Sequence, residues 1–160
     1  MRIAQGQNLW ELHESGGWVV IPTNLGWKRN GDNVMGRGLA LQAKVKFPNL
    51  SSEYGMFCRW RNEETSRTGL LCIDRARKLI LAPTKPLRVD SPWLSWQGKS
   101  SKALVVRSLE ELKGWFANNR CNLGLPLLGT GNGGLNREEI RDLIMRMFAG
   151  PEYDIITLYT

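Results

Sequence analysis

Two glycine-rich segments, each placed after an apolar strand and before a helix, most constrain the fold of this chain. They are Val34–Leu39 and Gly129–Leu135. At such a turn backbone N–H groups point outward, glycine lets the main chain approach a ligand closely, and the helix dipole favours an anion. In open α/β sheets, ligands bind at the carboxyl ends of the strands. We therefore expect the two loops to hold a phosphate-bearing nucleotide.

The hydrophobic pattern predicts a central, largely parallel sheet covered by helices. Short apolar runs bounded by turn residues predict strands at 18–21, 123–128 and 155–159, and a hairpin from 69–73 and 78–82. Helices are expected over 39–47, which stops at Pro48, from a capping box at Ser108–Glu111 to about 118, and from a second capping box at Asn136–Glu139. The last helix places five apolar side chains on one face: Ile140, Leu143, Ile144, Met147 and Phe148.

Composition favours one globular domain spanning residues 1–160. Hydrophobic residues make up 42% and charged residues 23%, which excludes a disordered chain. No apolar run approaches the roughly 20 residues of a membrane span, and the N-terminus lacks the apolar core of a secretory signal. We expect a cytoplasmic monomer without membrane contact.

The residues that bind metals and form disulfides are few. Three cysteines without CxxC spacing predict buried, reduced thiols, and a single histidine leaves a zinc site short of ligands. We expect no metal and no cofactor. A net charge of +7 attracts polyanions, with DNA as one candidate partner and a charged nucleotide as another.

Two common phosphate-binding motifs are excluded. The segment Gly129–Gly134 fits the string GxGxxG, but a dinucleotide site also needs an acid at the end of the next strand. The nearby acids Glu152 and Asp154 precede that strand. No GK[ST] follows either loop, so a P-loop is also excluded.

Three segments resemble those of one family, the macrodomains. Val34–Ala43 resembles their first ligand loop, Leu125–Leu135 resembles the second, and Ile21–Asn24 resembles the strand end that carries an Asn before the first loop. The similarity is strongest to the branch that contains terminal ADP-ribose protein glycohydrolase and the DarG-type DNA antitoxins, and it covers nearly the whole chain.

The resemblance implies a three-layer α/β/α sandwich with a mixed sheet and ADP-ribose lying across its crest. Asn24 would orient the distal ribose. The ligand-binding residues implied are Gln7, Asn8, Thr23, Asn24, Val34, Met35, Gly36, Arg37, Gly38, Leu39, Pro126, Leu128, Gly129, Thr130, Gly131, Asn132, Gly133, Gly134 and Leu135. Macrodomains usually carry an Asp for the adenine amino group where this chain has the neutral pair Gln7-Asn8, so adenine selectivity is left open.

The same resemblance nominates Lys85 as the catalytic nucleophile, because that branch carries a Thr-Lys pair at this point. A neutral amine can attack the anomeric carbon of the distal ribose and displace the attached group through a covalent intermediate. Partial burial and the cations Arg37 and Arg88 would lower the lysine pKa. Outside the family context, an ordinary solvated loop lysine is the alternative.

Three features set this chain apart from the pattern. Gly133 occupies the position of an acid that assists release in terminal glycohydrolase; DarG-type antitoxins also have glycine there, which favours a DNA substrate over a protein. Segment 26–33 is long and could be a substrate-facing flap. Trp93 and Trp96 follow Lys85 among basic residues, a pattern that suits base stacking or, alternatively, core packing.

We therefore expect an enzyme that removes ADP-ribose from a modified macromolecule, with a DNA base preferred over protein. Two alternatives remain open. One is a non-catalytic reader of ADP-ribose or a related nucleotide, and the other is a phosphatase acting on ADP-ribose-1''-phosphate.

Overall fold

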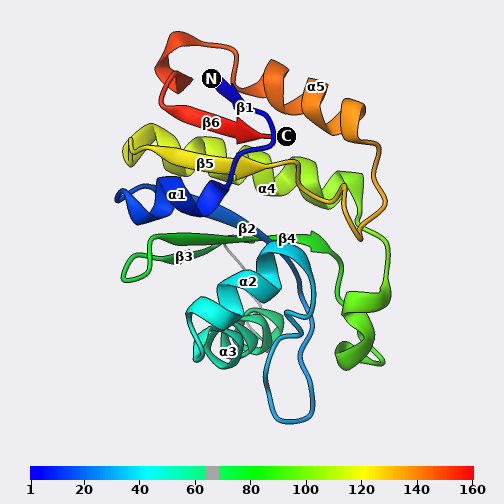
Figure 1. The fold of residues 1–160 in the computed structure, drawn as a ribbon. Helices are drawn as coiled ribbons and strands as arrows, with labels where there is room; N and C mark the ends of the chain where they lie inside the picture. Colours follow the sequence, from blue (N-terminus) through cyan, green and yellow to red (C-terminus); the bar gives the residue numbers. More distant parts are fainter. Residues whose placement is uncertain (64–68) are drawn as a thin grey trace.

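A computed structural model describes residues 1–63 and 69–160 and shows a six-stranded sheet between helices (Figure 1). The strands are β1 (Arg2–Ala4), β2 (Trp18–Asn24), β3 (Cys72–Asp74), β4 (Leu79–Lys85), β5 (Leu123–Pro126) and β6 (Ile156–Tyr159). The helices are α1 (Leu9–Glu14), α2 (Gly38–Lys46), α3 (Leu50–Glu63), α4 (Lys102–Asn118) and α5 (Arg137–Met147), with 3₁₀ helices η1 (Pro92–Gln97) and η2 (Pro151–Tyr153).

The strand order is β1-β6-β5-β2-β4-β3, and only the β3–β4 pair is antiparallel. The mixed, largely parallel sheet expected from the sequence is therefore confirmed. Because β2, β4 and β5 run in the same direction, their carboxyl ends meet at one edge of the sheet, on the right of Figure 1.

Two apolar cores fill the space on either side of the sheet. Alternate strand residues face opposite sides, so Val20 and Ile80 pack under α4 and α5 while Val19 and Leu79 pack under α1, α2 and α3. The helices supply matching apolar faces, among them Leu109 of α4. This arrangement is the predicted three-layer sandwich.

The helix starts show where the sequence patterns held. Asn136 caps α5 by accepting a hydrogen bond from the Glu139 amide at 3.0 Å, as its capping box predicts. The capping box proposed at Ser108 is wrong. The helix α4 begins at Lys102, and its N-cap is Ser101, seven residues before the predicted cap. Ser108 lies inside α4, where its hydroxyl donates to the Pro83 carbonyl of β4.

Other element boundaries differ modestly from those predicted. Strand β2 continues to Asn24, three residues beyond the predicted end, whereas β5 ends at Pro126, two residues early. The sequence analysis did not identify β1, α1 or α3. All three depend on packing against the sheet, and their apolar residues show too little periodicity to be identified from sequence.

All three cysteines lie in the described part of the chain and are free. Cys58 is buried, and Cys72 and Cys121 are partly buried. Burial raises the pKa of the Cys58 thiol to about 12 and those of the other two to about 11. The thiols are therefore neutral and poorly nucleophilic at physiological pH.

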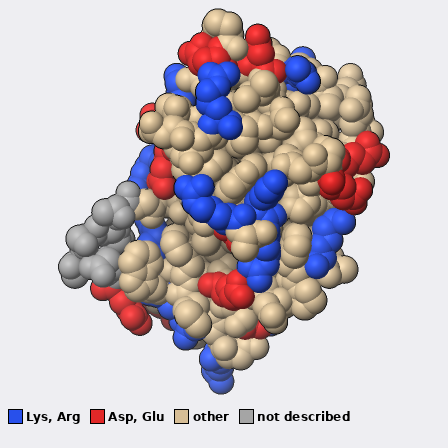
Figure 2. All heavy atoms as spheres, turned by 90° about the vertical axis from the view of Figure 1, so that its left-hand side faces the viewer, with Lys and Arg blue, Asp and Glu red and all other residues tan. Residues whose placement is uncertain are grey.

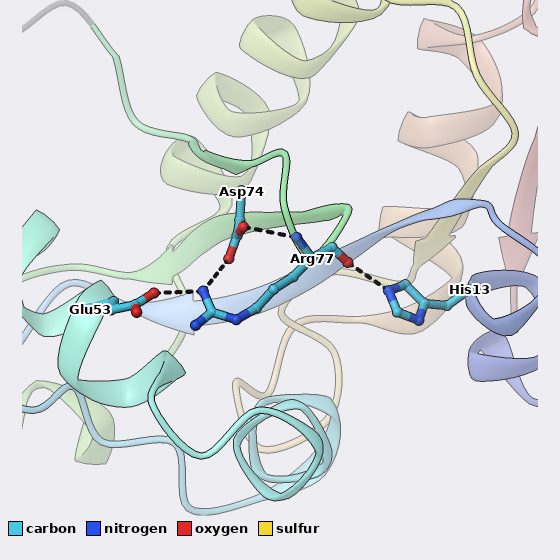
Figure 3. A network of polar contacts seen from close by, with 4 residues as sticks. All are labelled: His13, Glu53, Asp74 and Arg77. Carbon is cyan, nitrogen blue, oxygen red and sulfur yellow. Dashed lines mark hydrogen bonds and ion pairs between the residues drawn. The ribbon is translucent and has the colours of Figure 1, made fainter.

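A polar network joins the β3–β4 turn to two helices (Figure 3). The Arg77 guanidinium donates to Glu53 of α3 at 2.6 Å and to Asp74 at 2.7 Å. His13 of α1 donates from Nε2 to the Arg77 carbonyl oxygen at 2.7 Å. The hydrogen bond from Arg77 lowers the pKa of Glu53, and the two carboxylates raise the pKa of Arg77. The network thus fixes the start of β4, the strand that carries Lys85.

Figure 2 shows the face at the amino ends of the strands, where Lys and Arg side chains lie interspersed with Asp and Glu. Within residues 1–63 and 69–160, no helix is long and apolar enough to cross a membrane.

Replacing Arg77 by Met should lower the free energy of unfolding by about 1–3 kcal/mol, because charge-assisted bonds to two carboxylates are lost and Asp74 is largely buried. Arg75→Met is the matched control, since to residues 1–63 and 69–160 the Arg75 guanidinium makes one long hydrogen bond, of 3.5 Å to Asn119. Urea unfolding followed by circular dichroism measures both. Equal stability of the two variants would contradict a structural role for the network.

Candidate functional site

A cavity of about 630 Å³ opens at the carboxyl ends of β2, β4 and β5. Its walls come from both glycine loops, the start of α2, the end of β4 and the end of η1. Arg37 and Lys85 are the charged side chains among its described lining residues, and both are cations. A cavity of this size with cationic walls and exposed loop backbone suits an anionic, nucleotide-sized ligand.

The structure brings most of the predicted residues together at this cavity. Those that line it are Thr23, Asn24, Val34, Gly36, Arg37, Gly38, Leu39, Lys85, Pro126, Gly129, Gly131, Asn132 and Gly133. The remaining predicted residues do not line it: Gln7, Asn8, Met35, Leu128, Thr130, Gly134 and Leu135.

Four of the predicted residues that do not line the cavity have contacts elsewhere in the structure. Met35 and Leu128 are buried in the two cores. Asn8 caps α1 by accepting a hydrogen bond from the Trp10 amide at 3.1 Å. Thr130 donates to the Leu127 carbonyl at 2.8 Å, which tightens the second loop from behind. A ligand-binding role for these residues remains a prediction.

Two buried asparagines shape the first loop. Asn24 donates from Nδ2 to the Val34 carbonyl at 2.9 Å and accepts from the Gly26 amide at 2.9 Å. Asn33 donates to the Gly26 carbonyl at 2.8 Å and to the Asn24 carbonyl at 3.0 Å. Gly38, with φ of +57°, then turns the chain into α2. Asn24 therefore holds the loop in shape as well as lining the cavity.

The long segment 26–33 packs against neighbouring elements. A Cβ at Gly26 would overlap the Pro92 carbonyl and the Ser95 side chain of η1. A Cβ at Gly55 of α3 would overlap the Gly31 carbonyl. Within the segment, the Lys28 amide donates to the Asp32 carbonyl at 2.7 Å. These contacts fix the segment between η1 and α3.

Lys85 occupies its position because of the pairing between β2 and β4. The register shifts between Thr23 and Asn24, so Asn24 pairs with Lys85. The Lys85 ammonium donates to the Trp96 carbonyl at 2.7 Å. Partial burial and then the positive charge of Arg37 lower the pKa of Lys85. Arg88, the other cation expected to act on Lys85, is not among the causes of this shift.

The second loop rests on Ser100, a residue that sequence reasoning missed. The Ser100 amide donates to the Gly133 carbonyl at 2.9 Å, and its hydroxyl donates to the Thr84 hydroxyl at 3.2 Å. Thr84 in turn donates to the Thr23 carbonyl at 3.4 Å. These buried hydroxyls link the second loop to the ends of β4 and β2. A Cβ at Gly133 would overlap the Ser100 hydroxyl. The serine thus fills the space that a side chain at 133 would need.

Sequence reasoning also missed other lining residues. These are Pro22, Ala40, Thr84, Gln97, Ser100 and Leu127. Trp96, for which the sequence left base stacking and core packing open, also lines the cavity. Proximity to the predicted strand ends could have identified Pro22, Thr84 and Leu127. Ser100 and Gln97 carry no local signal, because a long connection after β4 returns them to the cavity.

Within the described residues, no three His, Cys, Asp or Glu side chains gather closely enough to hold a metal ion. The polar groups that line the cavity are the cations Lys85 and Arg37 and the surrounding amide and hydroxyl groups.

No protein-family model matches the chain. A Mycobacterium tuberculosis protein named DNA ADP-ribosyl glycohydrolase is 30% identical over 137 residues, which cover 77% of this chain and 34% of that protein. The macrodomain of Thermus aquaticus DarG is 25% identical with a TM-score of 0.69, covering 99% of this chain and 95% of that one. Thermosipho africanus DarTG in complex with ADP-ribose is 19% identical with a TM-score of 0.72, covering 99% and 41%.

The chain is a macrodomain. The family resemblance drawn from its loops is confirmed, as is the sandwich fold that the resemblance implied. The macrodomain spans about a third of the length of the curated relative that it matches.

Replacing Gly133 by Ala should lower the free energy of unfolding by about 1–3 kcal/mol, because the new methyl group overlaps the Ser100 hydroxyl and lies 2.5 Å from the Gly129 carbonyl. Gly131→Ala is the matched control, since a Cβ there would have no atom of the described residues within 4 Å. Thermal unfolding of both variants tests this. Equal melting temperatures would show that Ser100 moves aside freely and that position 133 can accept a side chain.

Proposed function

We propose that this macrodomain binds ADP-ribose and removes it from a modified DNA base, with Lys85 as the nucleophile. The observation that carries the proposal is a half-buried lysine of lowered pKa in the wall of a cavity whose charged side chains are both cations. Two relatives support it: one is named DNA ADP-ribosyl glycohydrolase, and another was solved in complex with ADP-ribose.

The two loops suit the diphosphate of ADP-ribose. Both lie at carboxyl ends of parallel strands, and each leads toward a helix whose N-terminus favours an anion. Arg37 adds a positive charge to the cavity wall, and the exposed residues Gly131 and Asn132 of the second loop line the same cavity. The distal ribose would then lie near Asn24 and Lys85, which pair across β2 and β4.

The lysine accounts for bond breaking. In its neutral form, the Lys85 nitrogen forms a bond to the anomeric carbon of the distal ribose, and the bond from that carbon to the base breaks. The base leaves with the electron pair and takes up a proton from water. A second water then replaces Lys85 on the same carbon, which restores the lysine and yields free ADP-ribose. Gly133 supplies no acid for these steps, the feature that favours a DNA base over protein as the substrate.

Removing Lys85 should abolish release while leaving binding. We expect Lys85→Ala to release ADP-ribose from an ADP-ribosylated oligonucleotide at least about a hundredfold more slowly than the unmodified chain. Lys113→Ala, at an exposed lysine of α4, is the matched control. Release is followed by chromatography of free ADP-ribose. Parallel assays with an ADP-ribosylated protein and with ADP-ribose-1''-phosphate identify the preferred substrate.

Two outcomes would contradict the hydrolase proposal. Tight binding of ADP-ribose without release by either protein would make this macrodomain a reader. Release of phosphate from ADP-ribose-1''-phosphate that persists in Lys85→Ala would make it a phosphatase. A thermal-shift titration with free ADP-ribose tests binding first, because a ligand at a hundred times its Kd raises stability by about 2.7 kcal/mol.

The pH dependence of release should report on Lys85. The rate constant kcat should rise with pH as the ammonium loses its proton, and level off above the lowered pKa of Lys85. Replacing Arg37 by Gln removes a charge that disfavours the ammonium, so the pKa of Lys85 rises and the rising limb moves to higher pH. In Arg88→Gln the limb should stay in place. If the rising limb of the pH profile of kcat does not move in Arg37→Gln, a group other than Lys85 controls it.

A further inference from the structure

The 3₁₀ helix η1 lies directly against Lys85. The Trp96 carbonyl accepts the hydrogen bond from the Lys85 ammonium at 2.7 Å, and Trp96 and Gln97 line the cavity beside it. In Figure 1 this helix extends as the green segment beyond the carboxyl end of β4. Any atom that Lys85 attacks therefore lies close to Trp96.

The geometry of the attack places the leaving group near the same residue. Reacting atoms stand about 3–3.5 Å apart before bond formation. The group that leaves is one bond farther from Lys85, and the residue whose backbone carbonyl contacts Lys85 is Trp96. The leaving group therefore lies on the side of the cavity to which Trp96 contributes part of the wall.

Trp96 is available for such a contact. Of the seven tryptophans, Trp10, Trp18, Trp27 and Trp115 belong to or pack against the two cores. Trp60, Trp93 and Trp96 are absent from both described cores, and Trp96 is 38% exposed. Core packing, the ordinary fate of a tryptophan, therefore does not account for Trp96.

The helix that carries Trp96 is held rigidly although its rings are exposed. Ser95 is buried, and its hydroxyl accepts a hydrogen bond from the Arg88 amide at 3.0 Å. Gly26 packs against η1 so closely that a Cβ there would overlap Ser95. A backbone fixed in this way presents an aromatic ring with little entropy left to lose on binding.

Cations surround these rings. The Arg29 guanidinium lies over the ring of Trp93 at 5.9 Å, and Trp93 is 42% exposed. Arg88 and Lys99 flank η1 in the sequence and are exposed. Between 86 and 102, Asp90 is the single acid. Exposed aromatic rings among cations are the surface that binds single-stranded nucleic acid, where bases stack and phosphates pair with the cations.

We propose that Trp96 is the platform on which the departing nucleobase stacks, and that η1 is the element by which this macrodomain selects a base-linked substrate over a protein-linked one. This inference rests on the proposed function and names the residue that determines its substrate class.

Binding measured without turnover tests the platform. In the Lys85→Ala background, we compare the Kd of free ADP-ribose with that of an ADP-ribosylated single-stranded oligonucleotide. The Kd of free ADP-ribose divided by the Kd of the oligonucleotide is the binding ratio, and it isolates the contribution of the base and strand to affinity. Adding Trp96→Leu should reduce this ratio about tenfold, and Trp96→Phe should retain most of it. Trp60→Leu, at an exposed tryptophan on α3, is the matched control and should leave the ratio unchanged. The corresponding ratio for an ADP-ribosylated peptide should not depend on Trp96.

If the binding ratio for the oligonucleotide is unchanged in a folded Trp96→Leu variant, the platform proposal is wrong. It is also wrong if the binding ratio for the ADP-ribosylated peptide falls by the same factor. If the leucine variant fails to fold, an oligonucleotide that carries ADP-ribose on a saturated, puckered base replaces it. Stacking predicts weaker binding of that ligand to the Lys85→Ala chain than of its flat counterpart, and equal binding refutes stacking.

The hydrolase and the platform fail separately. If the chain with Lys85 intact releases no ADP-ribose but the binding ratio still depends on Trp96, the hydrolase proposal fails and the platform proposal stands. If the chain releases ADP-ribose from the oligonucleotide but the binding ratio does not change in Trp96→Leu, the hydrolase proposal stands and the platform proposal fails.

Discussion

The pairing of β2 with β4 is the constraint on which the rest of the site depends. Ladder bonds hold the strands in register up to Thr23, and the shift after it brings Asn24 beside Lys85. Asn24 holds the first loop through its hydrogen bond to the Val34 carbonyl. Thr84, which precedes Lys85 in β4, accepts a hydrogen bond from Ser100, and Ser100 in turn holds the second loop. Both loops and the lysine thus derive their positions from the buried centre of the sheet, the part of a fold least free to move.

The electrostatics of the cavity follow from what the fold leaves out. A side chain at Gly133 is excluded by the Ser100 hydroxyl, so an acid cannot enter there without rearrangement. Arg37 then acts on Lys85 without a nearby carboxylate among the lining residues to oppose it. Burial and repulsion both favour the neutral amine, which is the form that can act as a nucleophile.

Local patterns were sufficient to predict features that have local causes. The glycine loops, the Asn136 cap and the buried apolar runs of the central strands follow from backbone conformation and the hydrophobic pattern, so the sequence predicts them well. Ser108 looked like a helix cap because its neighbours fit the pattern, but its hydroxyl bonds to β4, a contact that only the tertiary structure determines. Ser100 and Gln97 were not identified as lining residues for the same reason. They reach the cavity through a connection whose path local sequence does not specify.

The two asparagines that fasten the first loop also have an evolutionary consequence. Asn24 binds Gly26 at the start of segment 26–33, and Asn33 at its end is held by Gly26 and by the Ser51 carbonyl of α3. Lys28 and Arg29 in the stretch between them are exposed, and no residue of 26–33 is among the described residues that line the cavity. Lengthening a loop costs little once its ends are fixed. Descendants of this chain can therefore acquire new contacts at the tip of this segment while the site behind it keeps its shape.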